Sequence, residues 1–215
     1  YRGSMSLPRA SVVALTSSTL SNLHPQAARS VFWELDPLSE NYQGIDSQMD
    51  KSAWLLALVY EHKTAGFSIV DKRAHATLLM CPPSAAPGAV RLPTAPVSAD
   101  AYCLTSLHID AAFAGIGWEA VLVDAAVVAL TSRGLPAVEA FGVKADFTHE
   151  LTGMCKTIVE HAEQIGLMPV EVLESAGFKI VADHPVIPRL RLELPPEQGL
   201  LSEAEIAELL AQAPI

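Results

Sequence analysis

The stretch Tyr102-Cys-Leu-Thr-Ser-Leu-His-Ile-Asp-Ala-Ala-Phe-Ala-Gly-Ile-Gly117 decides the fold of this chain. Its apolar half, ending at Ile109, predicts a buried strand, and its two glycines predict a tight turn that opens a helix. Beyond the turn, apolar residues keep to one helical face, and Gly134 suits the position just past the helix end. Residues 137–141 then predict another buried strand. The sequence therefore predicts one strand–turn–helix–strand unit.

The turn over residues 112–117 predicts an anion site. Backbone N–H groups stay unpaired at the start of a helix, where they and the helix dipole attract a phosphate or pyrophosphate. We therefore expect a phosphate-bearing cofactor. The turn opens with Ala112 and holds only two glycines, whereas the dinucleotide-binding pattern G-x-G-x-x-G opens with glycine. A Rossmann oxidoreductase is disfavoured.

The unit resembles the central motif of the GNAT N-acetyltransferases, a strand, a Q/R-x-x-G-x-G/A turn and a helix. Further on, Leu173-Glu-Ser-Ala-Gly-Phe-Lys-Ile-Val181 is similar to the late L-x-x-x-G-F-x-x-V segment of that family. His184-Pro185, together with Pro188-Arg-Leu-Arg-Leu-Glu-Leu194, resembles the closing strand of actinobacterial members, and residues 92–98 resemble the same subgroup. The matches occur in the family order, which unrelated short matches seldom do.

The resemblance implies an α/β (α+β) protein with the GNAT fold. Its central sheet would be mixed, mostly antiparallel and twisted, with about six to seven strands flanked by helices and a V-shaped splay between the central strands. A single domain over residues 5–215 is expected, with early helices at 25–62, the core sheet and cofactor motif at 65–142, a C-terminal subdomain at 147–194 and a tail helix at 202–212. Residues 1–4 are typical of a cloning remnant.

The implied activity is transfer of an acetyl group from acetyl-CoA to a primary amine of a small molecule or peptide. The amine would attack directly, through a tetrahedral intermediate whose oxyanion needs a hydrogen-bond donor. By position, the resemblance assigns cofactor binding to the strand end and to the turn that follows. These residues are Leu107, His108, Ile109, Phe113, Ala114, Gly115, Ile116, Gly117 and Trp118.

Two residues depart from the family pattern. Ala112 stands where the family turn begins with Gln or Arg, so a pyrophosphate would be held by backbone amides without that side chain. Leu173 stands where many members carry the Tyr that protonates the departing thiolate, so the usual general acid is missing.

Two residues are candidates for the catalytic base. Glu139 lies near the expected splay, where partial burial would raise the pKa of its carboxyl group. The commoner alternative for a carboxylate on a strand is that it faces solvent or pairs with a cation. His108 ends the central strand and has a suitable intrinsic pKa, but it could equally be a packed histidine. If neither serves, a water chain would carry the proton.

Composition limits the partners. A net charge of −10 argues against nucleic acid and fits a cationic acceptor better. The apolar runs are too short for a membrane span, and three scattered cysteines indicate a reducing compartment, so a cytoplasmic location is predicted. His149, Cys155 and His161 are spaced off a common helical face, so no metal site is predicted.

The remaining elements are predicted from periodicity and turn residues. They are helices over 25–34, 46–62, 147–165 and 170–176, a hairpin of strands 66–70 and 74–80, a loop over 82–96, and strands over 179–182 and 189–194. Ser202 and Glu205 form a capping box that opens an amphipathic tail helix. This helix covers either its own domain or a partner subunit, so a homodimer is left open.

Two alternatives to an active acetyltransferase follow from Ala112 and Leu173. One is a non-catalytic acyl-CoA-binding or regulatory member of the family. The other is an α/β scaffold that binds no coenzyme A and acts as an interaction module through its tail helix or through the added helical region over residues 147–165. The sequence identifies neither the amine acceptor nor the length of the acyl group.

Overall fold

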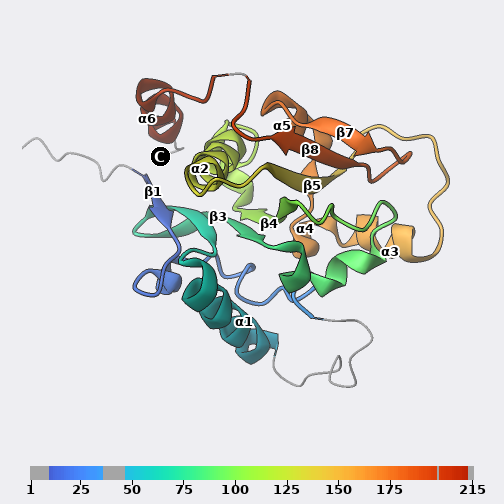
Figure 1. Ribbon diagram of the computed structural model, residues 1–215, viewed down its shortest axis with the longest axis horizontal. Coiled ribbons are helices and arrows are strands. Elements are labelled where there is room, and N and C mark those ends of the chain that lie inside the picture. The colour runs from blue at the N-terminus through green and yellow to red at the C-terminus, as the bar shows by residue number, and fades with distance from the viewer. Residues whose placement is uncertain (1–9, 36–46, 198, 213–215) are drawn as a thin grey trace, which may run out of the picture.

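The computed structural model describes residues 10–35, 47–197 and 199–212. One mixed sheet organises them, with the strand order β1-β2-β3-β4-β5-β8-β7 and a short β6 paired to β5 (Figure 1). The strands are β1 Ser11–Ala14, β2 Gly66–Asp71, β3 Arg73–Cys81, β4 Ala101–Ile109, β5 Ala137–Val143, β6 Met168–Pro169, β7 Lys179–Ala182 and β8 Arg189–Glu193. Only the β4–β5 and β5–β6 pairs are parallel. The predicted mixed, mostly antiparallel sheet is confirmed.

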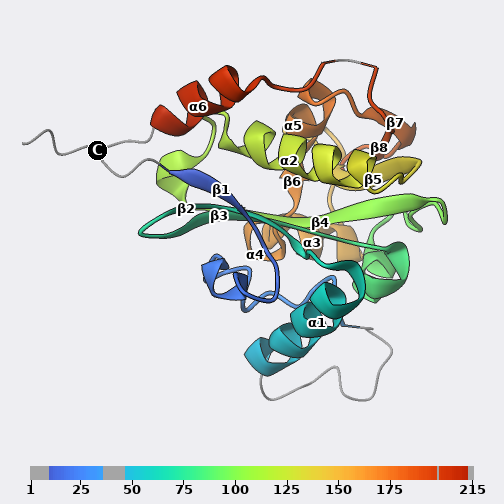
Figure 2. The ribbon, with the colours of Figure 1, turned by 60° about the vertical axis from the view of Figure 1, so that its left-hand side comes forward.

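Helices cover both faces of the sheet. The α-helices are α1 Ser47–His62, α2 Trp118–Ser132, α3 Gly153–Glu160, α4 Ala162–Ile165, α5 Val170–Ser175 and α6 Glu203–Ala211. Short 3₁₀ helices are η1 Leu20–Asn22, η2 Pro83–Ala85, η3 Pro87–Arg91 and η4 Ala111–Phe113. Figure 2 shows α2, α5 and α6 on one face and α1, α3 and α4 on the other. Because helices cover both faces of the sheet, the side chains of β4 are buried from Ala101 to His108, and neither side of this strand faces solvent.

The splay predicted between the central strands is present. β4 and β5 are in parallel register from Ala101 opposite Ala137 to Leu104 opposite Ala140. Their pairing ends there, although β4 continues to Ile109. The free end of β5 is instead paired with β6, through Gly142 and Val143.

Most predicted elements are found close to their expected bounds. The hairpin of β2 and β3 turns at Lys72, whose φ is 59°. The tail helix α6 begins with the predicted capping box between Ser202 and Glu205. The predicted first residue of α1, Asp46, and the expected cloning remnant at 1–4 lie outside the described residues. Within the described parts, none of the helices combines the length and apolar character that a membrane crossing requires.

Two predicted helices were wrong in whole or in part. Residues 25–34 form turns, because tertiary contacts hold this segment in place: Glu34 accepts a 2.5 Å hydrogen bond from Lys51, and the Trp33 indole donates to the carbonyl of Ile165. The long helix predicted over 147–165 begins only at Gly153 and is interrupted at His161. β1 was not predicted, since its pairing partner β2 lies far along the chain.

Candidate functional site

The turn between β4 and α2 has the features of an anion site. Gly115 and Gly117 have φ values of 78° and 103°, which glycine adopts without strain, and α2 begins at Trp118. Among the described residues, the backbone N–H groups of 116–120 have no hydrogen-bond partner. The Phe113 ring stacks on Trp118 at 4.4 Å between centroids and fixes the turn against the helix. Ala112 is exposed and adds only a methyl group.

A carboxylate of the chain itself reaches this turn. The N–H of Gly115 donates to Oε1 of Glu119 over 2.8 Å, on the exposed side of the turn. Glu119 therefore places negative charge beside the free amides, and that charge opposes the binding of a phosphate.

The tail helix α6 lies against the same turn (Figure 2). The Trp118 indole N–H donates to the carbonyl of Leu209 over 3.0 Å. A Cβ atom at Gly117 would lie only 2.7 Å from Leu209 Cδ2, so the side chain of Leu209 covers this glycine directly. The sequence left open whether the tail helix packs on its own domain or on a partner subunit. In the structure, α6 packs on its own domain.

The splay is filled by the chain that enters β6. The N–H of Leu107, which the resemblance assigns to the cofactor, donates to the carbonyl of Gly166 over 2.8 Å. The next residue, His108, has its Nε2 atom 3.0 Å from the carbonyl of Gln164. Both expected ligand-facing groups therefore contact residues 164–166. Ile109 continues the ladder with β3, opposite Ala76.

His108 is almost fully buried, with 2% of its surface exposed. Because Nε2 faces a carbonyl, that atom carries the ring proton and Nδ1 is a bare acceptor, with no partner in the described parts of the chain. The pKa of His108 is lowered from 6.5 to about 4, mainly by burial and to a smaller extent by Lys51 and His24, while the hydrogen bond at Gln164 opposes the shift. The imidazole is therefore neutral at neutral pH.

Glu139 is paired with cations, the alternative left open by the sequence. It is fully buried on β5 and contacts Arg189 and Arg191 of β8, with Arg191 Nη1 2.9 Å from Oε2. Burial pushes the pKa of Glu139 upward, but hydrogen bonds from Ser98 and the two arginines outweigh it and hold the pKa below its ordinary value. The expected raised pKa was wrong, and this carboxylate is not suited to accept a proton. It also lies where β4 and β5 are still paired, opposite Cys103.

A second charged cluster, which sequence reasoning missed, lies at the other end of β4. Asp110 is contacted by His24 Nε2 at 2.8 Å, by His75 Nδ1 at 3.0 Å and by Arg73 at 2.9 Å. Burial raises the pKa of Asp110, but the hydrogen bonds from His75 and His24 dominate and hold it below its ordinary value. Asp110 could have been found as the first carboxylate after a buried strand. Its histidine partners are too distant in sequence to predict.

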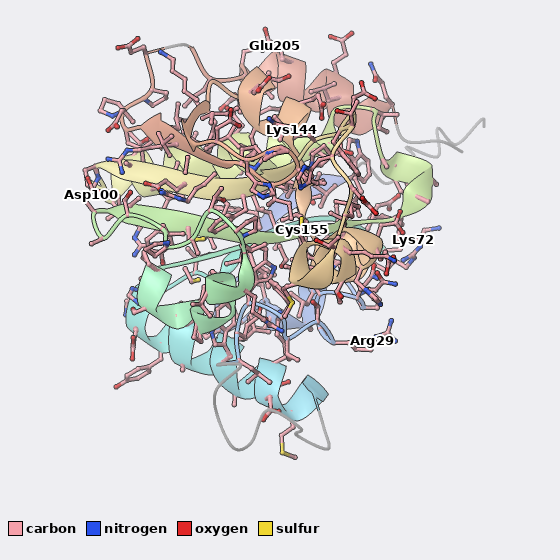
Figure 3. The ribbon with its side chains drawn as sticks, turned by 90° about the vertical axis from the view of Figure 1, so that its right-hand side faces the viewer. Arg29, Lys72, Asp100, Lys144, Cys155 and Glu205 are labelled. Atoms are coloured by element: carbon pink, nitrogen blue, oxygen red, sulfur yellow. The ribbon has the colours of Figure 1, made fainter. Side chains whose placement is uncertain are left out.

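The two clusters are far apart. Figure 3 shows Asp100, which pairs with Arg191 beside Glu139, at the opposite side of the molecule from Lys72, at the turn before Arg73. The splay and the turn therefore lie at the C-terminal end of β4, next to Asp110. Glu139 and its arginine partners lie near the N-terminal end of β4, opposite Cys103.

Four surface hollows of the described residues lie away from the turn. The largest of these four, about 930 Å³, is lined by residues 144–150 and Pro185. A hollow of about 450 Å³ between residues 30–35 and α3–α4 comes nearest to the splay, because Gln164 and Ile165 form part of its wall. It contains Arg91 and no carboxylate, so it does not resemble a pocket for a cationic acceptor. No three His, Cys, Asp or Glu side chains in the described ranges lie together as a metal site.

Comparison with known proteins bears on the fold. A scan of protein-family models and a search of curated protein sequences found no match to the chain. Among solved structures, an N-acetyltransferase from Staphylococcus aureus matches with a TM-score of 0.51 at 12% identity, over 86% of this chain and 98% of that one. A Salmonella typhimurium protein, solved with its cofactor acetyl-CoA, matches with a TM-score of 0.52 at 9% identity, over 90% and 99% of the two chains. The chain therefore has the fold of the GNAT acetyltransferases.

Proposed function

We propose that the chain is an N-acetyltransferase that moves an acetyl group from acetyl-CoA to a primary amine of a small molecule or peptide. The observation that carries this proposal is the arrangement of β4. The strand leaves its parallel partner after Leu104 and then leads directly into a turn with free amides at residues 116–120. The end of β4 therefore carries a backbone donor at the splay, the Leu107 N–H, and leads into an anion site at the N-terminus of α2.

The residues of the turn fit the phosphate part of the cofactor, and the splay holds a backbone donor for its acyl end, the Leu107 N–H, which is bonded to the Gly166 carbonyl in the free protein. When bound, acetyl-CoA supplies the acetyl group as a thioester, which amines attack readily. The amides of 116–120 would bind the pyrophosphate, and the Leu107 N–H would donate to a carbonyl oxygen. Ala112 and Glu119 both weaken the anion site, so we expect modest affinity.

The proton released by the amine has one candidate acceptor in the splay. Nδ1 of His108 has a free lone pair, but the low pKa of the buried ring makes it a weak base. Contact with water on opening of the splay would return this pKa toward its ordinary value. Leu173 is fully buried on α5 and offers no proton to a thiolate, so solvent takes that role.

The first test is calorimetric titration of acetyl-CoA and coenzyme A into the wild-type protein and Gly115→Asp. Gly134→Asp is a matched control, because Gly134 has nearly the same φ, 76° against 78°, and equally open surroundings at the other end of α2. We expect binding to wild type and to the control and none to Gly115→Asp, where a carboxylate would repel the phosphates. Thiol release with a panel of amines then identifies the acceptor. Failure of wild type to bind either ligand would overturn the proposal.

A non-catalytic acyl-CoA-binding protein is the second candidate. It is favoured by the contact between Leu107 and Gly166, which occupies the backbone donor of the splay. Acetyl-CoA binding without thiol release in the amine screen would distinguish it from the enzyme. The actinobacterial subgroup, a cytoplasmic location and a homodimer stay predictions of the sequence.

A further inference from the structure

Residues 164–169 run through the splay and hydrogen-bond to both of its sides. On the β4 side, the carbonyls of Gln164 and Gly166 accept from His108 Nε2 and from the Leu107 N–H, over 3.0 and 2.8 Å. On the β5 side, Met168 and Pro169 are in register with Gly142 and Val143. The two strand edges that separate after Leu104 and Ala140 are thus bridged by the chain itself.

The groups bonded to this segment are those that the proposed reaction needs. Leu107 supplies the backbone donor, and His108 supplies an imidazole on which the His24 ring stacks at 6.2 Å between centroids. Both donors are satisfied by carbonyl oxygens. The arm of an acyl-CoA carries two amide carbonyls and a thioester carbonyl, so it offers acceptors of the same kind. The segment and the arm therefore compete for the same donors.

Gly166 is what allows the chain to approach β4 so closely. Its φ is 79°, and a Cβ atom there would lie 2.7 Å from Ser106 Cβ and 2.8 Å from His108 Cε1. The segment packs closely against β4, but not every polar atom at this contact has a hydrogen bond. Ser106 Oγ and His108 Nδ1 are buried without hydrogen-bond partners in the described chain. An unpaired buried polar atom disfavours the closed arrangement relative to a hydrated one.

The elements that carry the segment are short. α4 has four residues and β6 has two, and the N–H groups of Gly166 and Leu167 are both bonded to the carbonyl of Ala162. Short elements with few hydrogen bonds open locally at lower free energy than the core strands beside them. Leaving the splay also requires the Ile165 carbonyl to release the Trp33 indole and the Ile165 side chain to leave its core contacts, but it requires none of the long strands to separate.

We propose that residues 164–166 are an internal plug, which occupies the acyl site in the free protein and is displaced when an acyl-CoA arm binds. This inference rests on the proposed function and adds its regulation. Only the fraction of molecules with an open splay binds the ligand, so the apparent affinity is reduced by that fraction. A substitution that expels the plug should therefore tighten binding.

The test compares Gly166→Ala with Gly134→Ala. Both place a side chain at nearly the same positive φ, 79° and 76°, but only the first meets neighbouring atoms, at Ser106 and His108. Hydrogen exchange at the Leu107 amide should be at least tenfold faster in Gly166→Ala than in the control. The pKa of His108, followed by NMR, should rise from about 4 in wild type toward 6.5. Acetyl-CoA should bind Gly166→Ala more tightly than the control, and thermal unfolding reports whether both variants are folded.

A measurement on the wild-type protein does not depend on either variant. Exchange at the amides of Gly166 and Leu167 should become faster when acetyl-CoA binds, although ligands usually slow exchange. Binding with unchanged or slower exchange at these two amides would overturn the plug and leave the proposed function intact. Absence of acetyl-CoA binding to the wild type would instead overturn the proposed function.

Discussion

Single residues decide how strongly the turn after β4 attracts an anion. The free amides of 116–120 favour negative charge, while Glu119 already supplies some through its hydrogen bond from Gly115. Ala112 adds no compensating cation. The electrostatic balance of the turn therefore depends on whether the Glu119 carboxylate stays in place when a phosphate approaches.

Glu119→Gln should bind acetyl-CoA more tightly than wild type. The amide keeps the size of the side chain and removes its charge, which is worth about 0.7 kcal/mol, or about threefold in Kd, at a helix N-terminus. Calorimetry at low salt measures the change. Glu171→Gln is the control, because Glu171 is an exposed acidic residue in the first turn of a different helix, α5. Equal affinities for the two variants would contradict the role of Glu119.

At the scale of elements, the tail helix and the turn are coupled through Leu209. Leu209 of α6 covers Gly117 and accepts from the Trp118 indole, so the position of α6 determines how open the first turn of α2 is. The helix is only nine residues long and has no fully buried side chain. It therefore depends on its capping box as well as on its packing against α2.

Ser202→Ala should fray α6 without unfolding the sheet. The Ser202 hydroxyl accepts from the Glu205 N–H over 3.1 Å, and the loss of such a cap costs about 1 kcal/mol. Hydrogen exchange over residues 203–211 should become about fivefold faster, while β4 and β5 keep their protection. Thr152→Ala is a suitable comparison, because Thr152 precedes α3 without making a side-chain cap bond. Equal exchange in α6 of both variants would show that packing alone holds the helix.

Across the whole molecule, sequence patterns predicted the elements whose structure depends on neighbouring residues. They did not predict the elements whose structure depends on contacts with distant parts of the chain. The glycine turn, the helix from Trp118 and the capping box at Ser202 each depend on neighbours in sequence, and each was found. Residues 25–34 show helical periodicity, but the distant partners of Trp33 and Glu34 override it. Sequence also placed His108 in the splay and offered a packed histidine as one alternative, but it did not predict the contact with Gln164, which lies more than fifty residues away. The same holds for Glu139, whose arginine partners on β8 are known only once the sheet order is known.

Global stability should report the burial of His108 through its pH dependence. The pKa of the ring is about 4 in the folded protein and 6.5 ordinarily, so between these values the unfolded chain binds a proton that the folded chain does not. Stability is therefore unaffected above pH 6.5, falls as the pH drops from 6.5 to 4, and loses about 3 kcal/mol from this group by pH 4. Glu139 and Asp110, whose pKa values lie below their ordinary 4.5 and 3.8, lose their contributions at still lower pH.

The variant His108→Gln separates this contribution from the others. Glutamine does not titrate, and its amide N–H₂ group keeps a donor for the carbonyl of Gln164. Urea unfolding at pH 7 and pH 5 should show a large loss of stability for wild type and a much smaller one for the variant, whatever their difference at pH 7. His161→Gln is the control, since it makes the same substitution at an exposed histidine. Parallel slopes for wild type and His108→Gln would mean that His108 is hydrated in solution, and hence that the splay is open in the free protein.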